Sequence, residues 1–119
     1  MTLAEFLAAR LDEKETAAKI AAVDDAWGQL RRTIPPEPGT LNRCHRLMDA
    51  CDPARVLRDV AAKRKILAAH QPERSVLPPS DDHKLVCVVC SQDWWPCDVL
   101  RTLGEIDSGH PDYNPEWRP

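Results

Sequence analysis

Three cysteines close together near the C-terminus constrain this chain more than any other feature. Cys87 and Cys90 form a Cys-x-x-Cys pair, and Cys97 follows a stretch that contains two tryptophans and a proline. Such a pair can place two thiolates on one zinc ion, and structural zinc sites are closed by four nitrogen or sulfur ligands in a tetrahedron. The sequence therefore predicts a structural Zn²⁺ site with these three cysteines as ligands.

The fourth ligand has several candidates among the histidines. His70 is the first choice, because it ends a predicted basic helix just before the segment that returns to the cysteines. His83 stands only four residues before Cys87, so the chain would have to fold back, and His110 would have to return from the tail. Two readings without metal stay open: buried thiols that pack as small hydrophobes, and a redox pair, which lacks its usual thioredoxin-like βαβ context.

The N-terminal part of the chain, residues 1–34, predicts one long helix over about 3–30. Thr2 and Glu5 have the spacing of a capping box at its start. The apolar side chains follow a helical period. They are Leu3, Phe6, Leu7 and Leu11, continued by Ala17, Ala18, Ala21 and Trp27.

Residues 40–70 predict two further helices. A short one over 41–50 would carry Cys44 and Cys51 as core cysteines. A longer one over 53–70 follows Asp52, which is an N-cap acid before a proline at the first helical position. The side chains expected to face the core from this longer helix are Val56, Leu57, Val60, Ala61 and Leu67.

The C-terminal part predicts a polar linker over 71–82, a short strand over 84–88, and a last helix from about Cys97 to Gly104 within the region 83–104. The prolines of the tail, residues 105–119, exclude regular helix there. We expect one mainly α domain over residues 1–119. It is an antiparallel helical hairpin with a C-terminal zinc-knuckle-like cysteine cluster and a short final helix.

Composition and motifs narrow the function. The net charge is −3, and the N-terminus lacks the basic-then-apolar order of a secretory signal. The apolar stretches are too short to span a membrane. We therefore expect a cytoplasmic protein with no membrane partner. The sequence has no His-Glu-x-x-His, no glycine-rich phosphate loop and no Gly-x-Ser-x-Gly, so we expect no enzyme.

Two groups of side chains are candidates for contact with a partner. Trp94 and Trp95 lie in the cysteine stretch, and tryptophan is enriched at binding hot spots. Residues 31–74 carry ten basic against five acidic side chains, so this segment is the expected surface for an anionic partner. Its candidate residues are Arg55, Arg58 and Arg64. Nucleic acid is therefore an alternative partner, with affinity that would fall with salt.

The chain also resembles a family of small actinobacterial and actinophage proteins known only as a domain of unknown function. The resemblance covers most of the chain. It rests on Asp52-Pro-Ala-Arg-Val-Leu-Arg58, Ala62-Lys-Arg-Lys-Ile66 with His70, the Cys-x-x-Cys pair, Trp95-Pro-Cys97 with Leu100-Arg101, and His110-Pro-Asp-Tyr113 with Trp117. It implies an actinobacterial or phage origin, and it implies no activity, substrate or partner.

Two departures from the family pattern bear on the zinc site. Family members often have a longer segment before the Asp-Pro helix. They also often have histidine directly before Asp-Pro, where this chain has Cys51. Because histidine and cysteine can replace each other as zinc ligands, Cys51 becomes a rival to His70.

The sequence thus predicts a small zinc-stabilised accessory protein that binds a macromolecular partner, which would be a host protein if a phage encodes the chain. The alternatives are a small nucleic-acid-binding regulator that uses the basic helix over 53–65, and a metal-dependent enzyme.

Overall fold

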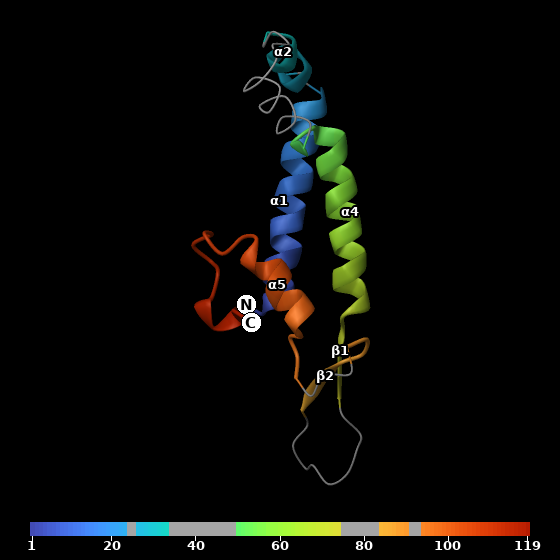
Figure 1. The fold of residues 1–119 in the computed structure, drawn as a ribbon, viewed down its shortest axis with the longest axis vertical. Helices are drawn as coiled ribbons and strands as arrows, with labels where there is room; N and C mark the ends of the chain where they lie inside the picture. The colour runs from blue at the N-terminus through green and yellow to red at the C-terminus, as the bar shows by residue number, and fades with distance from the viewer. Residues whose placement is uncertain (24–25, 34–49, 75–83, 91–93) are drawn as a thin grey trace, which may run out of the picture. The chain divides into compact units, whose positions relative to one another are not determined.

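The computed structural model describes residues 1–23, 26–33, 50–74, 84–90 and 94–119 (Figure 1). These residues are mainly helical, as the sequence predicts. The elements in chain order are α1 (Leu3–Val23), α2 (Ala26–Thr33), α4 (Pro53–Ala69), β1 (Pro72–Arg74), β2 (Leu85–Cys87), α5 (Asp98–Glu105) and a 3₁₀ turn (Pro115–Trp117).

The chain divides into two compact units. Unit 1 contains Met1–Arg10 and Arg64–Pro119, and unit 2 contains Leu11–Lys63. The single helix expected over 3–30 is described instead as α1 and α2, with residues 24–25 outside the description. The helix expected over 41–50 also lies outside the described residues, except for its last residue.

The start of α1 is the predicted capping box. The backbone N–H of Thr2 donates to Glu5 Oε2 over 2.7 Å, and the backbone N–H of Glu5 donates to Thr2 Oγ1 over 3.2 Å. The Thr2 hydroxyl also donates to Glu5 Oε2, over 3.0 Å, and the two bonds from Thr2 to the carboxylate hold the pKa of Glu5 below its usual range. Each side chain satisfies an amide that the first helical turn leaves unpaired.

The start of α4 is also as predicted. Asp52 Oδ1 accepts from the backbone N–H of Ala54 over 2.8 Å, and the Asp52 carbonyl accepts the first helical bond, from Val56. Pro53 stands at the first helical position, where a missing N–H costs nothing. Two local signals therefore fix where both long helices begin.

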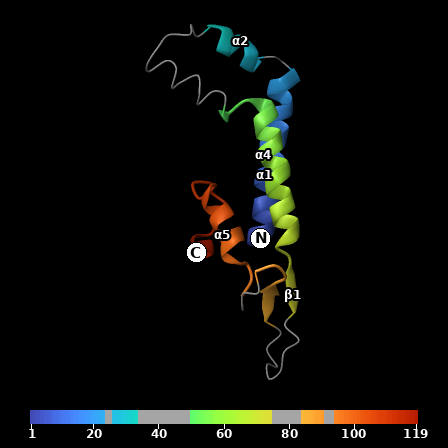
Figure 2. The ribbon, with the colours of Figure 1, turned by 45° about the vertical axis from the view of Figure 1, so that its right-hand side comes forward.

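Unit 2 packs the second half of α1 against the first half of α4, and the two segments run antiparallel in Figures 1 and 2. Leu11, Ala18 and Val60 are buried, as predicted. The predicted inward positions of Ala17 and Ala61 are wrong, since both side chains are exposed. The methyl group of alanine gains little free energy on burial, so it does not determine which face of a helix packs inward. The larger apolar residues determine the rotation of each helix.

Two short strands follow α4 in unit 1. β1 pairs with β2 antiparallel, with Pro72 opposite Cys87 and Arg74 opposite Leu85. The strand expected over 84–88 is therefore confirmed. The assignment of all of 71–82 to a linker is wrong, because its first residues form β1.

The core of unit 1 forms where the first turns of α1 meet α5 and the tail. Its buried members are Leu3, Phe6, Leu7, Cys87, Cys97, Leu100 and Tyr113. Gly104 of α5 permits the close approach, because a Cβ there would lie 2.9 Å from Leu3 Cδ1. Two of the three predicted zinc ligands are thus also core residues.

The tail docks on α1. Phe6 is fully buried and its ring contacts three aromatic rings of the tail, with centroid distances of 5.9 Å to His110, 5.8 Å to Tyr113 and 5.2 Å to Trp117. The guanidinium of Arg10 lies over the Phe6 ring, 5.3 Å from its centroid, and also contacts His110 Nε2. Among the described residues, no helix is both long and apolar enough to cross a membrane.

Candidate metal centre

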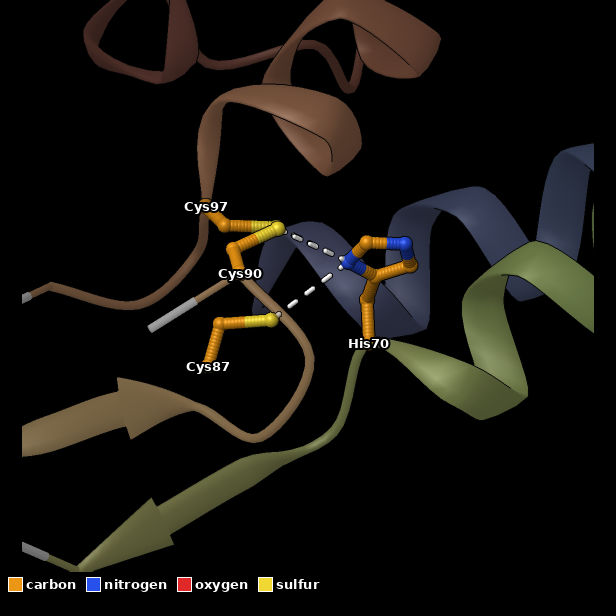
Figure 3. Close-up of side chains that lie close together, drawn as sticks. All are labelled: His70, Cys87, Cys90 and Cys97. Carbon is orange, nitrogen blue, oxygen red and sulfur yellow. Dashed lines mark hydrogen bonds between the residues drawn. The ribbon is translucent and has the colours of Figure 1, made fainter. Parts of the chain in front are cut away.

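Four segments of unit 1 each bring one metal-binding side chain to a common point. His70 follows the last residue of α4, Cys87 ends β2, Cys90 lies in the turn after it, and Cys97 is the N-cap of α5. Their ligand atoms all lie within 4.8 Å of one another. Figure 3 shows the imidazole and the three thiols pointing toward one another. The structure therefore assembles the four residues that the sequence analysis ranked first.

The distances from His70 Nδ1 to the three sulfurs fit tetrahedral coordination of a metal ion better than a network of hydrogen bonds. His70 Nδ1 lies 3.4 Å from Cys87 Sγ, 3.2 Å from Cys90 Sγ and 3.5 Å from Cys97 Sγ. A single imidazole nitrogen carries either one proton or one lone pair, so it cannot hydrogen-bond three sulfurs at once. Zinc bond lengths in a tetrahedron place nitrogen and sulfur about 3.6 Å apart. The cluster is slightly tighter than that, and it could hold a metal ion.

The turn between β2 and Cys90 orients the first thiol. Burial raises the pKa of Cys87, but the backbone N–H groups of Cys90 and Val89, followed by His70 and Cys97, lower it more, to about 7. Amides that donate to the thiolate favour the form that binds metal. In contrast, burial and the neighbouring Cys87 and Cys97 raise the pKa of Cys90 to about 12. A divalent cation at the centre would offset this repulsion among thiolates.

Hydrogen bonds outside the cluster fix the segments that carry the ligands. Trp95 Nε1 donates to the carbonyl oxygen of His70 over 3.2 Å, which ties the end of α4 to the loop before Cys97. The backbone N–H of Val88 donates to the carbonyl of Gln71 over 3.2 Å. Outer bonds of this kind orient the ligands of metal sites.

The rival ligands lie elsewhere or outside the description. Cys51 is exposed and does not belong to the cluster, so its predicted place in a core is also wrong. His110 does not belong to the cluster: its Nδ1 accepts from the backbone N–H of Asp112 over 3.1 Å, and its Nε2 contacts the Arg10 guanidinium. His83 lies outside the described residues.

The candidate partner residues differ in their surroundings. Trp94 is 44% exposed, whereas Trp95 is half-buried and packs against the core of unit 1. Arg55 and Arg58 of α4 are exposed, and Arg64 is half-buried. The structure thus leaves Trp94 and two of the three arginines open to solvent.

One residue beside the site was not singled out by sequence reasoning as functional. Arg101 of α5 donates from Nε to the carbonyl of Pro96 over 3.0 Å, directly before Cys97. An arginine between Leu100 and Thr102 on a short helix gives no local signal of such a contact. Leu100-Arg101 appears in the sequence analysis only among the residues that carry the family resemblance.

Comparison with known proteins gives a family but no activity. A family model described as a family of unknown function, DUF6221, matches residues 1–119. The chain belongs to the DUF6221 family. No curated protein and no solved structure matches this DUF6221 chain. The actinobacterial or phage origin implied by the resemblance stays a prediction.

Proposed function

We propose that this chain is a zinc-stabilised accessory protein that binds a partner protein. The observation that carries the proposal is the convergence of one imidazole nitrogen and three thiols on a single point, with spacings close to those of a tetrahedral zinc site. Three sulfur donors and one nitrogen donor suit Zn²⁺ better than the oxygen-preferring ions Mg²⁺ and Ca²⁺.

The role of the zinc in this proposal is structural. Four protein ligands fill a tetrahedron and leave no open position for a substrate or a water molecule, which a catalytic zinc needs. The ligands come from the end of α4, from β2 and its turn, and from the start of α5. One ion would therefore join three elements of unit 1.

The proposed partner contact is Trp94. It is 44% exposed although its neighbour, Trp95, is half-buried against the core. A large aromatic side chain held in water beside the cysteine cluster is suited to act as an anchor, since tryptophan is enriched at binding hot spots.

The paired variants Trp94→Ala and Trp95→Ala test this assignment. We expect Trp94→Ala to leave zinc content unchanged, to change the free energy of unfolding by about 0.5 kcal/mol or less, and to abolish partner binding. Trp95→Ala is expected to cost about 3 kcal/mol, because it removes a packed ring and its bond to His70. Chemical denaturation measures the change in stability, and in-cell photo-crosslinking from the exposed position 89, in the wild type and in Trp94→Ala, measures the loss of partner binding.

Equal destabilisation by the two variants would contradict the different roles of the two rings. A crosslinking yield at position 89 that Trp94→Ala does not lower, or that is no higher than at an exposed position of α1 such as Ile20, would contradict the partner contact.

The alternative partner is nucleic acid. Its support is the exposure of Arg55 and Arg58, which stand three residues apart and so share one face of α4. Binding through them would be largely independent of sequence and would weaken steeply with salt. Absence of a gel shift with DNA or RNA at low salt would dismiss this alternative.

A further inference from the structure

One side chain, Arg101, connects the metal cluster to the C-terminal tail by hydrogen bonds. Arg101 donates from Nε to the carbonyl of Pro96 over 3.0 Å and from Nη1 to the carbonyl of Arg118 over 3.2 Å. Pro96 directly precedes Cys97, whose own carbonyl accepts the backbone N–H of Arg101 over 3.0 Å. The planar guanidinium of Arg101 therefore bridges the residue before Cys97 and the end of the tail. Its rigid geometry fixes the angle between these two hydrogen bonds.

A second connection between the two regions runs through apolar contacts. Cys97, Leu100 and Tyr113 belong to the same buried cluster, and Trp117 packs against it. Tyr113 and Trp117 also contact each other edge to face, with ring centroids 5.6 Å apart. A displacement of Cys97 would therefore also displace α5 and the aromatic residues of the tail, since packed cores respond as units.

We propose that zinc binding and docking of the tail, residues 110–118, are energetically coupled, with Arg101 as the positioning residue. This inference rests on the proposed zinc site. Zinc holds Cys97, which fixes the Pro96 carbonyl and the start of α5. Arg101 is then placed to bond the Arg118 carbonyl. Because coupling between two binding events is reciprocal, a docked tail strengthens zinc binding as much as zinc strengthens docking.

The reciprocal effect gives the sharpest test, since the tail holds none of the four ligands. We expect Trp117→Ala and Arg101→Gln each to weaken Zn²⁺ binding by about fivefold or more, within the usual range of coupling between sites. The affinity is measured by competition with a chromophoric chelator, on full-length chains whose helicity matches the wild type. Glu116→Gln is the matched control, because Glu116 is exposed in the same 3₁₀ turn.

Hydrogen exchange on the zinc-loaded chains supplies the second measurement. The backbone N–H groups of Trp117 and Arg118 bond to the carbonyls of Asn114 and Pro115, and their exchange reports tail docking. We expect Arg101→Gln to speed exchange at both amides by about fivefold or more. Unchanged exchange there would overturn the role given to Arg101.

The outcomes separate the coupling from the zinc site itself. Tight wild-type binding of Zn²⁺ that neither variant weakens would overturn the coupling and leave the zinc site standing. A wild-type chain that binds no Zn²⁺ would overturn both.

Discussion

The replacement Cys90→Ser is expected to lower zinc content and thermal stability together. Cys90 Sγ is the sulfur nearest to His70 Nδ1, at 3.2 Å, and a serine hydroxyl is a poor zinc ligand. Apparent zinc-binding free energies in small zinc domains are about 10–16 kcal/mol at neutral pH, and this energy is part of the folding energy. We therefore expect the variant to lose most of its zinc and to melt at least about 10 °C lower.

The design includes a matched cysteine. Cys51→Ser changes the same atom at an exposed position outside the cluster, and it should keep both zinc and melting temperature. Chelation of the wild type should reproduce the melting temperature of Cys90→Ser, and chelation of Cys90→Ser should change it little. Full zinc content in Cys90→Ser would refute the assigned ligand set.

The second large effect is expected for Phe6→Ala. Phe6 is fully buried and contacts the rings of His110, Tyr113 and Trp117, so its removal leaves a cavity between α1 and the tail. Large-to-small changes of this kind cost about 3–5 kcal/mol. For a chain of this size, that lowers the melting temperature by about 10 °C or more.

Ile20→Ala is the control for Phe6→Ala. It shortens an apolar side chain of the same helix that is 59% exposed, and we expect a change of about 0.5 kcal/mol or less. Differential scanning fluorimetry followed by denaturant titration measures both variants. Similar losses from both would mean that the tail does not bury Phe6.

The features that the sequence predicted correctly depend on neighbours in the chain. The Thr2–Glu5 capping box and the Asp52 N-cap each involve residues two or three positions apart. The Cys-x-x-Cys turn is equally local. His70 could be ranked first because it stands at the end of a predicted helix whose start Asp52 and Pro53 fix.

The features that the sequence missed depend on contacts between distant segments. β1 spans three residues and exists through pairing with β2, so its own residues carry no periodic signal. Arg10 is buried because it meets His110, one hundred residues later in the chain. The sequence around a charged residue in a helix does not predict a partner so distant in the chain. The positions of Ala17 and Ala61 were missed because alanine fits either face of a helix.

The central claim is that His70, Cys87, Cys90 and Cys97 bind one zinc ion. X-ray absorption at the zinc edge on the purified protein, with metal content from mass spectrometry, tests it most directly. We predict one zinc per chain with three sulfur ligands at about 2.3 Å and one nitrogen ligand at about 2.0 Å. A purified chain without zinc, or a zinc ion with fewer than three sulfur ligands, would contradict the claim.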